Sequence, residues 1–173
     1  EHLPGIRIAS GSLGQGLSVS IGVAQAKKLS GDSSIVYCLM GDGEQNEGQV
    51  WEAAMYAPHH KVDNLIAFID ENGQQIDGPT EKVMSNRDLQ AKYEAFGWNV
   101  MRMDGNDAVD IQNTLIRAKA ELGKGSPIMI IMKTEMGAGV DFMMYSHKWH
   151  GVAPNDQQLQ DALAQLEETL GDY

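Results

Sequence analysis

The sequence of 173 residues is short of cysteine, of basic residues and of long apolar runs, and each shortage excludes a class of protein. The single Cys38 excludes a disulfide framework, and its place in the apolar run 35–40 predicts a buried, inert thiol. No apolar run approaches the roughly 18 to 20 residues that a membrane-spanning helix needs. Only 13 Lys and Arg stand against 24 Asp and Glu, a net charge of −11. This charge disfavours general nucleic-acid binding, which depends on neutralising phosphates.

What is present is the composition of one globular domain. Hydrophobic residues make up 42% and charged residues 21% of the chain, so a core is feasible and disorder is disfavoured. The length fits one ordinary domain, and we treat residues 1–173 as a single domain that is part of a larger one. No basic, apolar leader is visible, which predicts a cytoplasmic protein. The first residue is Glu1 and not methionine, so processing and missing upstream sequence are both open alternatives.

Short apolar runs alternate with segments of helical spacing. The runs are nearly continuous and rich in β-branched residues, as in strands covered on both faces: Ser34–Met40, Asn64–Asp70, Trp98–Met103 and Pro127–Lys133. The helical segments are Leu13–Leu29, Gln49–Tyr56, Asp88–Phe96 and Asp107–Leu122. This alternation predicts an α/β fold with a mostly parallel sheet and helices on both faces.

Two of the expected helices carry an apolar stripe. The first places Leu13, Leu17, Ile21 and Ala24 on one face. A last helix over Asp156–Leu170, with Asp156 as its N-cap, aligns Leu159, Leu163, Leu166 and Leu170. Two long loops, at about 71–87 and 134–155, follow predicted strand ends, where open α/β sheets bind ligands.

The strongest local motif is Gly41-Asp42-Gly43-Glu44, directly after the first strand. Asp-Gly is a common tight turn, and a hairpin is the alternative interpretation. The next segment is helical, however, and glycines on both sides of an acid let the backbone approach a phosphate at a helix N-terminus. The acid would repel that phosphate unless a divalent cation bridged the two.

A second ligand for such a cation is available at the next strand end. Asn72 lies thirty residues after Asp42, one strand–helix–strand step later, within the segment 70–78. Asn-Gly is itself a frequent turn, so Asn72 alone is a weak signal. One carboxylate, an amide oxygen, a backbone carbonyl and phosphate oxygens form a hard oxygen set that suits Mg²⁺.

Together these segments resemble the thiamine-diphosphate signature, and in detail they resemble transketolases. Three segments carry the resemblance: the glycine-rich Gly11–Ser18, the diphosphate segment Gly41–Gly48, and Ile76–Gly78, which closes the metal loop. The similarity extends from about Pro4 to Gly151. It implies the thiamine-diphosphate-binding fold and a likeness to the N-terminal subunit of a split transketolase, shortened at its start.

The resemblance assigns roles by position. It implies that Asp42, the side chain of Asn72 and the carbonyl of Gln74 bind Mg²⁺, or another divalent cation such as Ca²⁺ or Mn²⁺. It places the remaining cofactor contacts on Gly41 and Gly43 at the diphosphate, Gly11 and Leu13 beside the thiamine rings, and Ile76 under the bent cofactor. His150 would reach the diphosphate and the reacting sugar, and Glu47 would link two active sites at a dimer interface.

The residues alone leave plainer alternatives open. Leu13 and Ile76 fit a hydrophobic core, and composition favours that interpretation. Glu47 fits a first-turn acid that complements a helix dipole. His150 shares a polar loop with His147, which fits simple surface exposure.

The resemblance also implies an activity and a partner. The activity would be transfer of a two-carbon glycolaldehyde unit from a ketose phosphate to an aldose phosphate, in carbohydrate metabolism of the pentose phosphate type. An acid from a pyrimidine-binding domain, on a partner subunit or domain, would complete the site in a dimer of the whole assembly. The alternatives are a 1-deoxyxylulose-5-phosphate synthase, a 2-oxoacid dehydrogenase component, or a non-catalytic cofactor-binding module.

Overall fold

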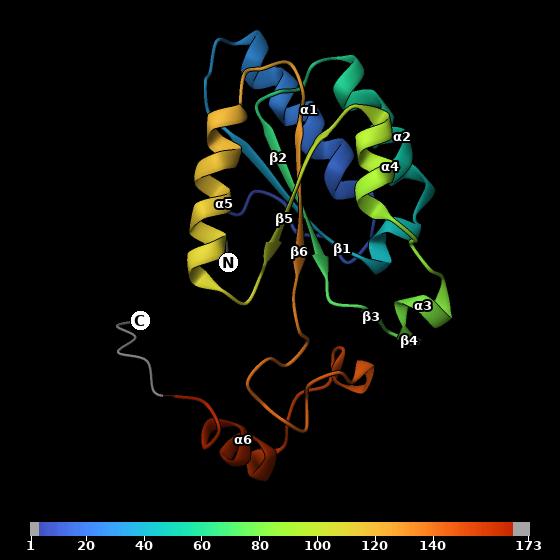
Figure 1. The fold of residues 1–173 in the computed structure, drawn as a ribbon, viewed down its shortest axis with the longest axis vertical. Helices are drawn as coiled ribbons and strands as arrows, with labels where there is room; N and C mark the ends of the chain where they lie inside the picture. The colour runs from blue at the N-terminus through green and yellow to red at the C-terminus, as the bar shows by residue number, and fades with distance from the viewer. Residues whose placement is uncertain (1–3, 168–173) are drawn as a thin grey trace.

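A parallel four-stranded sheet organises the computed structural model, which describes residues 4–167 (Figure 1). The strand order is β1-β2-β6-β5, and every pairing in this sheet is parallel. The strands are β1 (Val36–Gly41), β2 (Leu65–Glu71), β5 (Asn99–Asp104) and β6 (Ile128–Lys133). Each overlaps one predicted apolar run and ends within one residue of it, so the predicted α/β fold with a mostly parallel sheet is confirmed.

Helices cover the sheet unequally. On one face lie α1 (Gln15–Leu29), α2 (Gly48–His59) and α4 (Leu89–Phe96), whereas α5 (Ala108–Glu121) lies on the other (Figure 1). The short elements are η1 (Gly43–Asn46), α3 (Thr80–Val83), η2 (His147–Trp149) and α6 (Asp156–Leu163). Among residues 4–167, no helix combines the length and the apolar character needed to cross a membrane.

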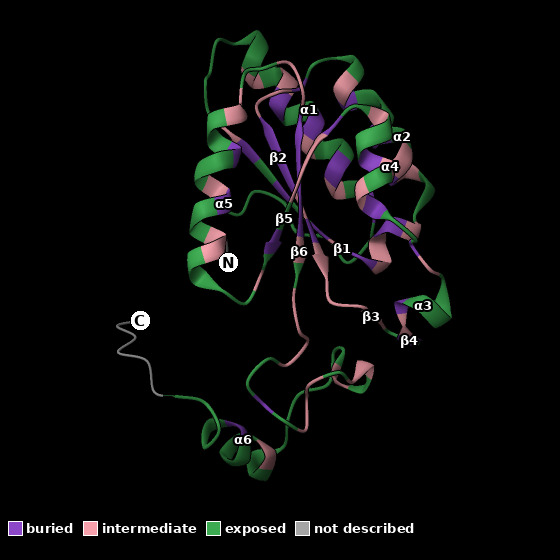
Figure 2. Cartoon of the chain, viewed as in Figure 1, coloured by how far each residue is buried: buried purple, intermediate pink, exposed green. Residues whose placement is uncertain are grey.

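The core consists of two clusters, one on each face of the sheet. The larger joins α1, α2 and α4 to the sheet and includes Cys38, whose predicted burial is confirmed at 5% exposure. Burial also raises the pKa of the Cys38 thiol, in keeping with an inert role. The smaller cluster joins Ala118 of α5 to Ile128 and Ile130 of β6. Because β2 and β6 are central, they are buried on both faces (Figure 2).

The edge strand β1 departs from the prediction of strands covered on both faces. Its residues alternate between buried and exposed, and Tyr37 and Leu39 are 48% and 69% exposed. Helix α5 packs on β5, and no comparable contact joins α5 to β1 in the described chain. The outer face of β1 therefore carries two large apolar side chains in contact with solvent.

Two helix predictions are wrong at their ends. Helix α1 begins at Gln15 and not at Leu13, because Gly14 takes the left-handed conformation with φ 84°; Leu13 is left outside the helix and 47% exposed. Helix α6 is capped by Asn155 and not by Asp156, since Asn155 and Gln158 form a capping box. Leu159, Leu163 and Leu166 of its predicted stripe are 44 to 55% exposed, and Leu170 lies outside the described residues.

The segment after β2 is more ordered than the predicted long loop. It contains a two-residue antiparallel ladder between β3 (Gln74–Gln75) and β4 (Gly78–Pro79), followed by α3. The N–H of Thr80 donates to the carbonyl of Gly73 at 2.9 Å and closes this small hairpin. Gly73, with φ 74°, makes the turn that leads into it. The loop is thereby held against the end of β2.

Candidate functional site

The predicted metal loops lie at the same edge of the sheet. Gly41, the last residue of β1, pairs with Asp70 of the adjacent β2, and the N–H of Asp42 donates to the carbonyl of Asp70 at 3.1 Å. Asp42 therefore leaves the sheet directly beside the segment that leads to Asn72. Parallel pairing brings the two loops together because carboxyl ends of neighbouring parallel strands share one edge.

Asp42 is a buried carboxylate held by neutral donors. It is 3% exposed, and its Oδ2 accepts hydrogen bonds from the N–H of Gly73 at 2.9 Å and from the hydroxyl of Thr80 at 3.2 Å. Burial raises the pKa of Asp42, the donors partly offset this, and the nearby Asp70 raises it further. No ion pair in residues 4–167 involves Asp42. A buried acid with an acidic neighbour and no ion pair in the described residues fits a site for a bound cation.

The second loop supplies amide and carbonyl oxygens. Asn72 accepts the N–H of Gln74 on its Oδ1 at 2.8 Å and donates to Asp70 Oδ2 at 3.4 Å, so its amide orientation is fixed. The Oε1 of Gln74 is buried and makes no hydrogen bond. No group of three or more His, Cys, Asp and Glu side chains within residues 4–167 is arranged to hold a metal. Any cation here would therefore rely on at most two carboxylates together with neutral oxygens, which is a donor set that suits a hard ion.

A network of amides fixes the backbone of the Gly41–Gly43 turn. Asn86 donates to the carbonyl of Asp42 at 2.6 Å and accepts from Asn46 at 2.8 Å. Asn46 in turn accepts from Gln75 at 3.1 Å. A Cβ placed on Gly43 would lie 3.0 Å from Cγ of Gln75, so the glycine allows this close approach. Sequence reasoning did not identify Asn46, Gln75 or Asn86, because polar residues in a loop carry no signal of their partners.

The glycine-rich loop lies beside this turn. Gly11 and Leu13 are both exposed, and the carbonyl of Leu13 accepts a hydrogen bond from Gln49 at 3.1 Å. The carboxylate of Glu44, for which the sequence suggested no role, accepts hydrogen bonds from Gly14 and from Gly41. The interpretation of Leu13 as a core residue is wrong. Glu44 thus joins the two glycine-rich segments.

Ile76 and Glu47 also lie at the surface. Ile76, in the turn between β3 and β4, is 67% exposed, so the core interpretation of this residue is wrong as well. Glu47 is exposed at the N-cap position of α2, where its side chain makes no capping hydrogen bond. Its Cβ lies against Gly14, since a Cβ on that glycine would be 2.8 Å away. Both side chains are free to face a ligand or a partner.

His150 ends the short helix η2, which packs beside β4. Its N–H donates to the carbonyl of His147 at 2.9 Å, and its side chain is exposed. Trp149 anchors this part of the loop by donating to the carbonyl of Phe142 at 2.8 Å, with the two rings 5.5 Å apart. The loop 134–155 therefore returns to the β3–β4 hairpin of the predicted metal loop, and His150 lies at the surface there.

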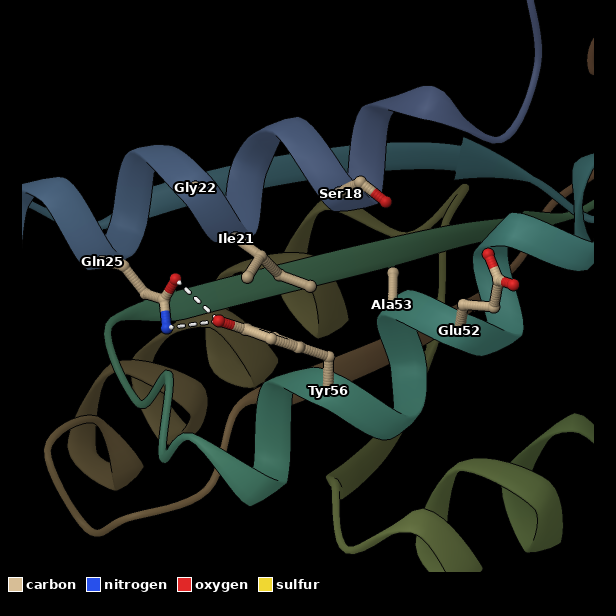
Figure 3. A pocket seen from close by; sticks show the side chains of 7 residues that line it. All are labelled: Ser18, Ile21, Gly22, Gln25, Glu52, Ala53 and Tyr56. Carbon is tan, nitrogen blue, oxygen red and sulfur yellow. Dashed lines mark hydrogen bonds between the residues drawn. The ribbon is translucent and has the colours of Figure 1, made fainter.

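Two hollows accompany these elements. One of about 210 Å³ adjoins the predicted metal loop, with Asp42, Thr80, Asn86, Arg87 and Lys133 in its lining. The other, of about 350 Å³, lies between α1 and α2, and Gln25 and Tyr56 are hydrogen-bonded beside it (Figure 3). None of the sequence-predicted site residues lines this second hollow. The first is the hollow at the candidate site.

The sequence matches known proteins over nearly its whole length. Residues 1–171 match the family described as transketolase, thiamine diphosphate binding domain. The chain is 40% identical to one subunit of the apulose-4-phosphate transketolase of Phocaeicola vulgatus, over 98% of this chain and 59% of that protein. It is 39% identical to 6-deoxy-6-sulfo-D-fructose transketolase subunit SqwG of a Clostridium species, over 94% of this chain and 58% of that one. The chain thus spans about three fifths of these relatives.

Solved structures agree with the family match. Transketolase from Campylobacter jejuni superimposes with a TM-score of 0.83 at 34% identity, over 93% of this chain and 26% of that one. Transketolase from Leishmania mexicana gives 0.83 at 29%, over 93% and 25%. The agreement of sequence and fold over nearly the whole chain confirms the resemblance inferred from the glycine-rich segments. The chain belongs to the transketolase family and comprises its thiamine diphosphate binding domain.

Proposed function

We propose that this chain binds the diphosphate end of thiamine diphosphate through a divalent cation and forms part of a transketolase. The observation that carries the proposal is the buried Asp42, which forms no ion pair within residues 4–167 and accepts the Gly73 N–H at 2.9 Å. Its charge requires compensation, and a cation bound together with a diphosphate would supply it. When bound, the cofactor would provide the carbon nucleophile for making and breaking carbon–carbon bonds.

The proposed cation ligands are the carboxylate of Asp42, the Oδ1 of Asn72 and the carbonyl of Gln74. Mg²⁺ is the proposed ion, and Ca²⁺ or Mn²⁺ suit the same oxygen donors. The Gly73 N–H and the Thr80 hydroxyl both donate to Oδ2 of Asp42, and we assign Oδ1 to the cation. The neutral donors thus orient the carboxylate without neutralising it.

The remaining roles concern the rest of the cofactor. Gly41 and Gly43 would let the diphosphate approach the backbone, with the Gly43 N–H as a donor. The exposed Gly11, Leu13 and Ile76 would contact the thiamine rings. His150 would hold a proton toward a phosphate or sugar oxygen and so stabilise developing negative charge. Glu47, exposed at the N-cap of α2, would face the partner.

We further propose that activity requires a partner polypeptide or domain that binds the pyrimidine ring, in a dimer of the whole assembly. Two relatives are named as subunits, and the chain spans about three fifths of their length. The reaction would transfer a two-carbon unit between sugar phosphates. Because the two relatives are named for different sugars, the donor and acceptor are best identified with a panel of ketose and aldose phosphates, including those of the pentose phosphate pathway.

The binding step is tested by thermal unfolding of the full-length protein with its partner polypeptide. A ligand at about 100 times its Kd stabilises the folded state by about 2.7 kcal/mol. We expect Mg²⁺ with thiamine diphosphate to raise Tm, and Asp42→Ala to abolish that rise. Asp161→Ala removes an exposed acid of α6 and is the matched control. An unchanged rise in Asp42→Ala would remove Asp42 from the cation site.

The reaction is tested by mixing the chain with the polypeptide encoded beside it and assaying transfer. Ketol transfer by the mixture, with none by either component, is the expected result. Product formation from pyruvate would favour a related thiamine-diphosphate enzyme. Cofactor binding without turnover with any partner would favour a binding module. Turnover by the chain alone would refute the need for a partner.

A further inference from the structure

One side chain joins the two glycine-rich loops of the proposed cofactor site. Oε1 of Glu44 accepts the N–H of Gly14 at 2.7 Å, and Oε2 accepts the N–H of Gly41 at 3.1 Å. Gly14 lies 30 residues before Glu44 in the chain, whereas Gly41 lies 3 residues before it. The carboxylate therefore bridges the loop that precedes α1 and the turn that carries Asp42.

The glycine-rich loop has a second attachment to the same segment. Gln49, in the first turn of α2, donates from its Nε2 to the carbonyl of Leu13 at 3.1 Å. A Cβ on Gly14 would lie 2.8 Å from Cβ of Glu47 and 2.9 Å from Cγ of Gln49, so the backbone there is in close contact with the start of α2. Glu44 accepts from the N–H of Gly14 and Gln49 donates to the carbonyl of Leu13, so two side chains hold adjacent residues of the loop.

The chemistry of Glu44 makes it suited to this task. A carboxylate has two oxygens and accepts two N–H donors at once, and such charge-assisted bonds are about twice as strong as neutral ones. No ion pair within residues 4–167 involves Glu44, so the backbone N–H groups are the partners of its charge there. A glutamine in its place has one oxygen and would turn its NH₂ toward one of the two N–H groups.

We propose that Glu44 is a positioning residue. It fixes the position of the Gly11–Leu13 loop relative to the Asp42 turn and thereby sets the affinity for the ring portion of the cofactor. The proposal rests on the function proposed above. Gly41 is also held by its pairing with Asp70 in the sheet and by Gln45, whereas the loop at Leu13 and Gly14 is held by Glu44 and Gln49, so loss of Glu44 should displace the ring-side loop more than the Asp42 turn. Its loss should weaken binding of the whole cofactor but spare binding of the diphosphate moiety alone.

The test compares two probes, thiamine diphosphate and inorganic diphosphate, each with saturating Mg²⁺, on the full-length protein with its partner. For Glu44→Gln we expect about a 10-fold rise in the Kd of thiamine diphosphate, the effect of losing one charge-assisted bond. The Kd of inorganic diphosphate should change by less than about twofold. Hydrogen exchange in peptides covering Gly14 and Gly41 should become about 10-fold faster without any cofactor. Glu121→Gln, at the far end of α5, is the control and should change none of these values.

A second variant keeps the test decisive if Glu44→Gln folds poorly. Gln49→Ala removes the other attachment of the loop, and we expect the same selective loss for thiamine diphosphate. Equal losses for both probes, in step with a lower Tm, would mean a merely structural role and would overturn the proposal. So would unchanged affinities in both variants. Wild-type protein that binds neither probe would instead refute the proposed function itself, so the two failures are distinguishable.

Discussion

The hydroxyl of Tyr93 offers a sharp test of how the core supports the site. Tyr93 is fully buried, and its hydroxyl donates to Oε1 of Gln45 at 2.6 Å. Gln45 is 1% exposed and donates in turn to the carbonyl of Gly41 at 3.0 Å. The chain of bonds runs from the aromatic core beneath α4 to the residue that precedes Asp42. The perturbation is Tyr93→Phe, which removes one oxygen atom from this chain.

The magnitude follows from what the change leaves behind. The phenylalanine ring keeps the contacts with Trp51 and Trp98, whose ring centroids lie 5.4 and 5.5 Å from that of Tyr93. The Oε1 of Gln45, however, loses its donor in a place that water does not reach. An unsatisfied buried polar atom costs about 1–3 kcal/mol. For a chain of this size that is a fall in Tm of roughly 2–12 °C.

Urea unfolding followed by tryptophan fluorescence measures the cost, since two tryptophans contact the ring. Tyr145→Phe is the matched control because that side chain is 68% exposed and water can replace any bond of its hydroxyl. We expect Tyr145→Phe to lie within about 0.5 kcal/mol of wild type. If Tyr93→Phe is equally mild, the bond to Gln45 contributes nothing and the reasoning fails.

Two further predictions concern backbone strain and pH. Gly14→Ala should lower the free energy of unfolding by about 1–2 kcal/mol because of its φ of 84°, and by about 1–3 kcal/mol more because of the contact with Glu47. Gly31→Ala, at φ 73° with nothing within 4 Å, should show only the first of these losses. Equal losses for the two variants in urea unfolding would contradict the close contact at Gly14. Burial raises the pKa of Asp63, but the Lys28 ammonium at 2.5 Å and the Gly125 N–H lower it more, so the net pKa is below its ordinary value. The stability from Asp63 is thus present above its unfolded pKa of about 3.9 and is lost as pH falls through the folded pKa. Asp63→Asn should cost about 0.5–1.5 kcal/mol at pH 7 and progressively less as the pH falls through the folded pKa of Asp63, and a difference that does not change with pH would refute this.

The sheet and the meeting of the two loops could be predicted from the sequence because both depend on local signals. Runs of β-branched residues mark the strands, and parallel order follows from the helices between them. Once β1 and β2 are neighbours, Asp42 and Asn72 must leave the sheet at one edge. Contacts between residues at the ends of neighbouring strands can therefore be predicted from a single sequence.

What could not be predicted depends on partners distant in sequence or on competition between local signals. Leu13 continues the period of α1, yet Gly14 in the left-handed conformation keeps it out of the helix. The leucines of α6 have a helical period, yet Leu159 and Leu163 stay 44% and 55% exposed in the described chain. Nothing in the sequence pairs Glu44 with Gly14, because such a bond exists only after the two loops have met.

The hairpin of β3 and β4 has a consequence for how quickly a ligand can be captured. Its ladder and the Thr80–Gly73 bond order the segment that holds Asn72 and Gln74 when the protein folds. The entropy of ordering these residues is therefore lost during folding, and an arriving ion does not have to supply it. If the proposed cation binds there, no slow loop closure would have to precede it, and the exchange of its own coordinated water would set the pace of binding.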